Sequence, residues 1–292
     1  MAYFSFTDAS NETFVIRVTD RDDIAHARAL LAGTTTDAAR VGGTIIKVPA
    51  DYNIGWSYKL APDSIMFYDA SIEVADSTMR YIETHLSEVG GHLLPGRQWA
   101  GWSTTLTSEL TVRSGSWAND ILHGQTEVDD LMFGRGGNDI LFSYGGNDHL
   151  SGGDGNDILK AARGDDKLGG GDGNDILEAD WGDDFLHGGR GSDVLIGGGG
   201  DDVFLAGRFS DCDRDVIADF EGGRQLEDQI RFDRTWLREI GDVNDDGRVN
   251  RRDIAAAFEE KGEDLVLDLR GSSITLENAA GTQLHVNDFL IG

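Results

Sequence analysis

Residues 151–206 read SGGDGNDILKAARGDDKLGGGDGNDILEADWGDDFLHGGRGSDVLIGGGGDDVFLA and repeat one nine-residue pattern. Each unit opens with glycine and acidic or amide residues and ends with a short apolar stretch. One aspartate per unit sets the period, and the series runs through Asp130, Asp139, Asp148, Asp157, Asp166, Asp175, Asp184, Asp193 and Asp202. An apolar residue follows each aspartate two positions later. Equal spacing over this length indicates a stacked repeat structure rather than a linker.

Charge and glycine are concentrated in the same part of the chain. The 292 residues hold 53 acidic and 25 basic side chains, a net charge of −28, and residues 115–207 hold 19 acids, 5 bases and 24 of the 40 glycines. An acidic chain of this kind is a poor partner for nucleic acid or an anionic membrane surface. We expect no transmembrane segment, because no apolar run approaches the ~18 residues that a span needs. The first residues lack the basic and apolar regions of a cleavable signal peptide.

The residue types predict the shape of one repeat. Glycine and aspartate favour tight turns, and the last three residues of a unit suit a very short strand with one inward apolar side chain. One unit cannot bury enough surface alone, so stacking is required. If two units make one coil, residues eighteen apart stack on the same side. One side then carries Asp139, Asp157, Asp175 and Asp193, and the other carries Asp130, Asp148, Asp166, Asp184 and Asp202.

Stacked carboxylates need a cation between them. Strand spacing places them ~5 Å apart, where they repel one another. Ligation by carboxylates and backbone carbonyls alone suits Ca²⁺ better than Zn²⁺ or Mg²⁺. Without the ion, the high charge and scarce apolar residues predict disorder. We therefore expect calcium binding and folding to be one equilibrium.

The repeat resembles the calcium-binding nonapeptide GGxGxDxUx of the RTX, or haemolysin-type, family. The resemblance implies a parallel β-roll over 115–207, with several Ca²⁺ ions held in the turns, and export by a type I secretion system. The metal-site residues that it implies are the nine aspartates above together with Gly152, Gly155, Gly170, Gly173, Gly188 and Gly191. Stacked pairs of turns give seven possible roll sites. The leading glycine pair is replaced at 143–144, 161–162 and 179–180, so we expect weaker sites on that side.

Residues 208–292 predict a β-rich cap with a second kind of calcium site. Asp215 and Asp219 are candidates to close the last roll site, although a capping strand pair with solvated charges is the alternative. Residues 242–253 have the twelve-residue spacing of an EF-hand loop and resemble a single dockerin-type loop. Its candidate ligands are Asp242, Asn244, Asp246, Arg248, Asn250 and Asp253. The alternative is a polar turn before a helix, which we place at 254–262.

The last part of the chain supports the same interpretation. Its polar and apolar residues alternate as strands do. Asp288 to Ile291 resemble the uncleaved C-terminal signal of type I secreted proteins, although a plain terminal strand has a similar sequence. We expect a secreted protein that lacks a cleavable N-terminal signal.

Residues 1–110 predict an α+β domain. Strands are expected at 13–20, 43–50 and 64–74, and helices at 20–33 and 75–91. This domain resembles one found at the start of a slime-mould calmodulin-binding protein. It lacks HExxH and GxSxG, so neither a serralysin-type protease nor a lipase of the α/β-hydrolase type is indicated.

Two groups of residues in this domain have alternative interpretations. The first could bind a metal or cap a helix, and contains Glu83, His85, Glu88 and His92. The second could form an aromatic ligand surface or pack in the core, and contains Trp56, Trp99 and Trp102.

The sequence therefore predicts a secreted calcium-binding protein made of an α+β domain, a β-roll and a β-rich cap with an EF-type loop. We expect the N-terminal domain to bind an extracellular ligand, either carbohydrate or protein. One alternative is a calcium-stabilised secreted hydrolase with catalytic residues in 1–110. Another is a partner protein that docks through its dockerin-like loop.

Overall fold

The computed structural model describes residues 1–7, 13–34, 40–46, 59–60, 66–68, 98–100, 105–206, 213–222, 228–232, 234–241, 250–269 and 272–291. Two compact units make up the chain, residues 1–112 and residues 113–292.

The first unit contains a three-stranded antiparallel sheet in the order β2-β1-β7. Its strands are β1 (Ala2–Thr7), β2 (Thr13–Val18) and β7 (Thr105–Glu109). Strand β2 confirms the strand expected at 13–20, whereas β1 was not predicted. The central strand β1 pairs with β2 from Ala2↔Val18 to Thr7↔Thr13.

Helix α1 (Arg21–Leu31) lies where the sequence predicts it. The Asp20 carboxylate accepts hydrogen bonds from the backbone N–H groups of Asp22 and Asp23, which satisfies two donors at the helix start. Gly33 follows the helix with φ +65°, a conformation that glycine adopts at little cost. Arg28 on this helix makes a bidentate ion pair with Glu109 on β7.

A second sheet of this unit is built around β3 (Arg40–Ile46). It pairs antiparallel with β4 (Lys59–Leu60), β5 (Met66–Tyr68) and β6 (Gln98–Ala100). The strands expected at 43–50 and 64–74 therefore appear in part. The helix expected at 75–91 lies outside the described residues.

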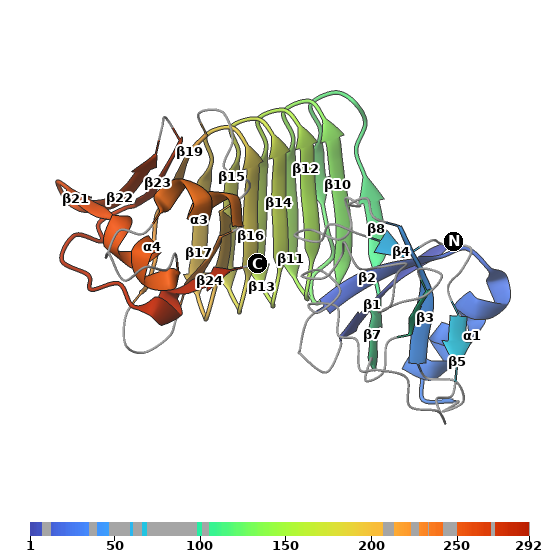
Figure 1. Ribbon diagram of the computed structural model, residues 1–292. Helices are drawn as coiled ribbons and strands as arrows, with labels where there is room; N and C mark the ends of the chain where they lie inside the picture. The colour runs from blue at the N-terminus through green and yellow to red at the C-terminus, as the bar shows by residue number, and fades with distance from the viewer. Residues whose placement is uncertain are drawn as a thin grey trace. The chain divides into compact units, whose positions relative to one another are not determined.

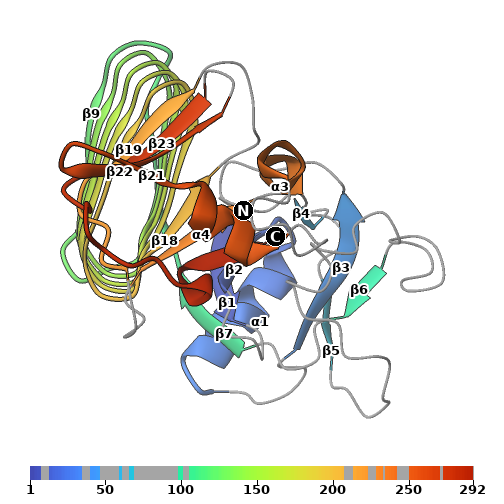
Figure 2. The ribbon, with the colours of Figure 1, turned by 60° about the vertical axis from the view of Figure 1, so that its left-hand side comes forward.

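The repeats form a β-roll of two parallel sheets (Figure 1). Figure 2 looks nearly along the roll, so that successive coils overlie one another. Consecutive strands alternate between the sheets, and each pairs with the strand eighteen residues later, as at Leu150↔Leu168 and Leu159↔Leu177. One sheet contains β8 (Thr111–Ser114), β10 (Asp130–Gly136), β12 (His149–Asp154), β14 (Lys167–Asp172), β16 (Phe185–Arg190) and β18 (Val203–Ala206). The other contains β9 (Ile121–His123), β11 (Ile140–Gly145), β13 (Ile158–Arg163), β15 (Ile176–Trp181) and β17 (Val194–Gly199).

A narrow apolar core runs between the two sheets. It consists of the residues found two positions after each aspartate, all at most 3 % exposed, namely Met132, Leu141, Leu150, Leu159, Leu168, Leu177, Leu186, Leu195 and Phe204. Each coil thus buries only two large side chains, so each coil depends on its neighbours for a closed core. This arrangement confirms the predicted stacking, with two nonapeptides per coil.

The cap continues both sheets of the roll. Strand β19 (Arg214–Ile217) pairs parallel with β17, and β20 (Gln229–Phe232) pairs parallel with β18. These two strands therefore extend different sheets and do not form the strand pair considered as the alternative. The remaining elements are α3 (Arg234–Ile240), α4 (Arg251–Ala257), β21 (Glu259–Lys261), β22 (Asp264–Leu269), β23 (Ser272–Leu276), η4 (Val286–Asp288) and β24 (Phe289–Ile291).

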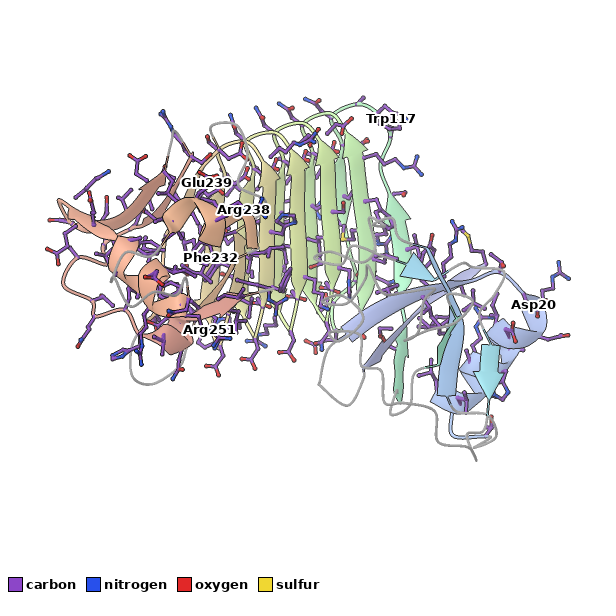
Figure 3. The ribbon with its side chains drawn as sticks, in the orientation of Figure 1. Asp20, Trp117, Phe232, Arg238, Glu239 and Arg251 are labelled. Atoms are coloured by element: carbon purple, nitrogen blue, oxygen red, sulfur yellow. The ribbon has the colours of Figure 1, made fainter. Side chains whose placement is uncertain are left out.

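An aromatic cluster fills the cap. Phe232, labelled in Figure 3, packs edge-on against Trp236 and lies 6.0 Å from the ring centre of Phe289. Phe258 stacks on Phe289 at 5.9 Å. This packing explains why the helix expected at 254–262 is wrong at its end: Phe258 is already extended, with ψ 134°, and residues 259–261 pair with β22.

Candidate calcium sites

The turns of the roll lie along two opposite edges (Figure 1). We call the first the glycine edge, formed by turns 134–139, 152–157, 170–175 and 188–193. We call the second the alanine edge, formed by turns 143–148, 161–166, 179–184 and 197–202. Each turn has six positions, and the aspartate that sets the period is at position six.

A ladder of hydrogen bonds joins the position-six aspartates along each edge. On the glycine edge, the Asp139 N–H donates to Asp157 Oδ1 at 2.7 Å, and the Asp157 N–H donates to Asp175 Oδ1 at 2.8 Å. On the alanine edge, the Asp148 N–H donates to Asp166 Oδ1 at 2.7 Å, with the same spacing of eighteen residues. One oxygen of each carboxylate therefore satisfies the backbone of the preceding coil. The two sides that the sequence predicted are the two sides observed.

The other oxygen of these carboxylates has no hydrogen-bond partner among the described residues. The side chains are at most 2 % exposed. The unpaired buried atoms are Oδ2 of Asp139, Asp148, Asp157, Asp166, Asp175, Asp184, Asp193 and Asp202. A buried carboxylate oxygen without a partner is strongly unfavourable. A row of them calls for a cation or for protons.

Glycine at turn position one leaves the unpaired oxygens a shared space. A Cβ added to Gly152 would lie 2.3 Å from Asp157 Oδ2 and 2.6 Å from the Gly170 carbonyl oxygen. At Gly170 the same two contacts, with Asp175 Oδ2 and the Gly188 carbonyl oxygen, would be 2.2 and 2.5 Å. A carboxylate of one coil and a carbonyl of the next thus converge where no side chain stands. Such oxygen ligands fit a calcium ion, which accepts mixed carboxylate and carbonyl coordination.

Glycine at turn position four has a different role. Gly155, Gly173 and Gly191 all have φ between 127 and 142°. A Cβ on any of them would lie 1.9 to 2.0 Å from the carbonyl oxygen of the preceding coil. These glycines let the turns stack at strand spacing. Calcium ligation by these three residues stays a prediction.

Burial makes these carboxylates hard to ionise. On the glycine edge, desolvation raises the pKa of Asp157 and Asp193 to about 6 and that of Asp175 to about 7. On the alanine edge it raises the pKa of Asp166 to about 9 and that of Asp184 to about 8. Neighbouring carboxylates add to the increase. A bound cation would restore the charged form.

Three further pKa values follow the same cause. Desolvation raises the pKa of Asp148 and Asp202 to about 6. The pKa of Asp130 is also raised by burial, although the N–H of Gln125 and the charge of Arg113 oppose the increase.

The cap supplies the last acceptor of each ladder. Asp193 N–H donates to Asp215 Oδ1 at 3.2 Å, and Asp202 N–H donates to Asp228 Oδ1 at 3.1 Å. Burial raises the pKa of both Asp215 and Asp228 to about 7. The Asp219 carboxylate accepts from the N–H groups of Gly197 and Gly198, so it holds the final turn.

Asp228 was not predicted from the sequence. The ladder steps that lead into the cap are 22 and 26 residues long, so the period of eighteen does not reach them. The signal that marks Asp228 is local: Asp228-Gln229-Ile230 repeats the order of aspartate, any residue and apolar residue. Asp215-Val216-Ile217 has the same order.

Only the end of the predicted EF-type loop is described. Asn250 and Asp253 form a capping box at the start of α4, in which the Asn250 N–H donates to Asp253 Oδ2 at 2.8 Å. Asp242, Asn244, Asp246 and Arg248 lie outside the described residues. A calcium site in this loop stays a prediction.

The other candidate groups are treated in the same way. Glu83, His85, Glu88, His92, Trp56 and Trp102 lie outside the described residues, and Trp99 lies in β6 without a described side chain. Within the described ranges, no three His, Cys, Asp or Glu side chains gather into a metal-binding cluster. Sites in the roll therefore depend on backbone carbonyls as well as carboxylates.

Comparison with known families agrees with this geometry. Residues 114–211 match the RTX calcium-binding nonapeptide repeat in five overlapping segments. The chain is an RTX repeat protein. Its nonapeptides bind Ca²⁺ at multiple sites, and RTX proteins are typical substrates of type I secretion. Residues 1–113 match a family model of an N-terminal domain, in agreement with the resemblance to the slime-mould protein noted for this region.

Whole-chain comparisons add little. Among solved structures, an extracellular lipase, LipA from Serratia marcescens, is 21 % identical with a TM-score of 0.32, and the match covers 64 % of the RTX chain. The chain spans 41 % of that lipase. No curated protein matches it by sequence. No described helix is long and apolar enough to cross a bilayer.

Proposed function

We propose that this RTX protein is a secreted, calcium-responsive protein whose roll folds only outside the cell. The row of buried, unpartnered Oδ2 atoms supports this proposal most strongly. Without a cation, these carboxylates repel one another and remain desolvated. Each coil buries too little apolar surface to offset that penalty.

The calcium difference across the cell envelope would then control folding. Cytosolic calcium is scarce, so the repeats would stay unfolded for passage through the type I secretion apparatus. Extracellular calcium-binding modules have dissociation constants of about 10⁻⁴–10⁻³ M, which matches the concentration outside cells. Binding and folding would be one linked equilibrium.

The segment Asp288 to Ile291 fits this sequence of events. Phe289 is fully buried in β24, which pairs with β20 at the edge of one sheet. In an unfolded cap the segment would be accessible as an export signal. In the folded protein it becomes part of the calcium-stabilised structure.

The folded roll would present residues 1–110 as a binding domain. The proposed ligand is an extracellular carbohydrate or protein, and the domain itself performs no turnover. The unit that contains this domain has its own sheets and helix, so it does not need the roll to supply its secondary structure.

Circular dichroism of the full chain during calcium titration tests the central claim. Metal-free protein should show little β-structure at neutral pH, and millimolar Ca²⁺ should restore it, whereas equal Mg²⁺ should not. Asp157→Asn/Asp175→Asn should shift the transition to higher calcium. The matched variant Asp154→Asn/Asp172→Asn, in which both positions are exposed, should not. A metal-free sample with a full β-spectrum and no calcium uptake would refute the proposal.

A further inference from the structure

The two edges of the roll differ at turn position one. On the glycine edge this position holds Gly134, Gly152, Gly170 and Gly188. On the alanine edge, three of the four turns hold a residue with a Cβ, namely Ser143, Ala161 and Ala179. All three are fully buried. The difference therefore lies inside the turns and not on their surface.

On the glycine edge, position one borders a space that two oxygens share. A Cβ would lie within 2.2 to 2.4 Å of an aspartate Oδ2 and within 2.5 to 2.6 Å of a carbonyl oxygen of the next coil at three positions, Gly134, Gly152 and Gly170. We call these three spaces the cradles. A cation and a Cβ cannot both occupy a cradle, because the distances available are those of single Ca–O contacts, about 2.3–2.6 Å.

On the alanine edge, hydrocarbon occupies the equivalent space. Ala161 and Ala179 stand five residues before Asp166 and Asp184, as Gly152 stands before Asp157. Water is excluded more completely there, in line with the larger pKa increase of Asp166 and Asp184.

The backbone path does not explain the difference. Position two is left-handed on both edges, with φ 112° at Gly153 and 93° at Ala162. The aspartate ladder also has the same length and spacing on both edges. The fold is thus held constant while the contents of the turn change.

The extra carboxylates of the alanine edge are already engaged. Asp165 and Asp183 are at position five, where the glycine edge has Asn156 and Asn174. Asp165 Oδ1 accepts the Asp183 N–H at 3.1 Å, which repeats the bond from the Asn174 N–H to Asn156 Oδ1 at 2.8 Å. Their first role is therefore the same as that of the amides.

The last turn of the alanine edge regains glycine without regaining the cradle. A Cβ on Gly197 would meet Asp202 Oδ2 at 2.2 Å, but its next neighbours are Asp202 Cγ and a ring carbon of Phe204. No carbonyl oxygen is among these nearest atoms. We therefore do not count this turn as a fourth cradle.

We propose that tight calcium binding in the roll is confined to the three cradles of the glycine edge, and that the turns of the alanine edge are packed by side-chain carbon instead of an ion. This inference rests on the proposed function, because it assigns the places of the ions that drive folding. It reduces the seven roll sites expected from the sequence to three tight ones.

Calcium stoichiometry of the full chain, measured by isothermal titration calorimetry and equilibrium dialysis, tests the inference. An Asp242→Ala/Asp246→Ala background removes any contribution of the EF-type loop. In that background, we expect three tight ions. Ala161→Gly/Ala179→Gly should add two, and Gly152→Ala/Gly170→Ala should remove two. Crystal structures with a lanthanide in place of calcium should place the ions on one edge.

Ala162→Gly is the matched control. It makes the same chemical change on the same edge at position two, outside the cradle, and should add no ion. Because the glycine-to-alanine variant can fail to fold, the gain from Ala161→Gly/Ala179→Gly decides the question. Equal occupancy of both edges, or no added ion in that variant, would overturn the inference. Absence of any calcium-induced folding would instead overturn the proposed function.

Discussion

The backbone N–H of Asp157 donates to Oδ1 of Asp175, eighteen residues later, at 2.8 Å, while Oδ2 of Asp175 is buried without a partner. One carboxylate thus has two tasks. Its first oxygen joins two coils, and its second is available to an ion. The following predictions separate these tasks from the packing around them.

Asp175→Asn should lower calcium affinity without removing the ladder bond. The amide oxygen can still accept the Asp157 N–H, but the charge that holds the cation is lost. We expect the calcium midpoint of folding to rise by roughly 10-fold or more, in line with the effect of removing metal-site partners. Titration followed by circular dichroism measures it. Asp172→Asn, at a half-exposed position three residues earlier, is the control, and an equal shift in both variants would contradict the assignment.

Acid should partly replace calcium. The pKa values of Asp166 and Asp184 are about 9 and 8 in the folded roll, against 3.8 for an ordinary aspartate. A raised folded pKa means that the folded roll binds protons more tightly than the unfolded chain, so stability is gained as pH falls from about 9 towards 4. Metal-free protein should therefore gain β-structure between about pH 8 and pH 5. A coil-like spectrum throughout that range would show that protons cannot fill this role.

Leu168→Ala should destabilise the calcium-loaded roll by about 2–5 kcal/mol. The Leu168 side chain is fully buried between Leu150 and Leu186 in the paired strands, and its loss leaves a cavity that a stacked core cannot close. Chemical denaturation in saturating calcium gives the free energy of unfolding. Ile176→Ala removes a side chain that is 40 % exposed and should have a much smaller effect. Similar losses for both variants would argue against a single inward row.

Gly173→Ala should disrupt the stack more than Gly262→Ala does. Both glycines have positive φ, so alanine at either position should lose about 1–2 kcal/mol from backbone strain. At Gly173 the new Cβ would also lie 2.0 Å from the Gly155 carbonyl oxygen, whereas at Gly262 nothing lies within 4 Å. Thermal unfolding in saturating calcium compares them. Equal melting temperatures would mean that the turns are not stacked as closely as described.

The repeat itself was predictable because its geometry is local and periodic. The nine-residue interval between Asp157 and Asp166 predicted two turns per coil, and pairing of Leu150 with Leu168 confirms it. Asp228 was missed because the connection into the cap breaks the period while the sheet continues. The helix expected at 254–262 was too long because Phe258 packs on Phe289, a contact between residues that are distant in sequence.

The N-terminal unit shows the same limit. Asp20 and Gly33 marked the ends of α1 because capping depends on neighbouring residues. Strand β1 was not predicted because its place between β2 and β7 depends on a partner about one hundred residues away.

The alternation of two unlike turns within one coil restricts how the roll can change in length. Deleting a single nonapeptide would shift every downstream turn to the opposite edge, so that glycine-bearing and alanine-bearing turns would share one column. Loss or gain of eighteen residues preserves both columns. Shortened or lengthened forms of this roll should therefore differ by whole coils.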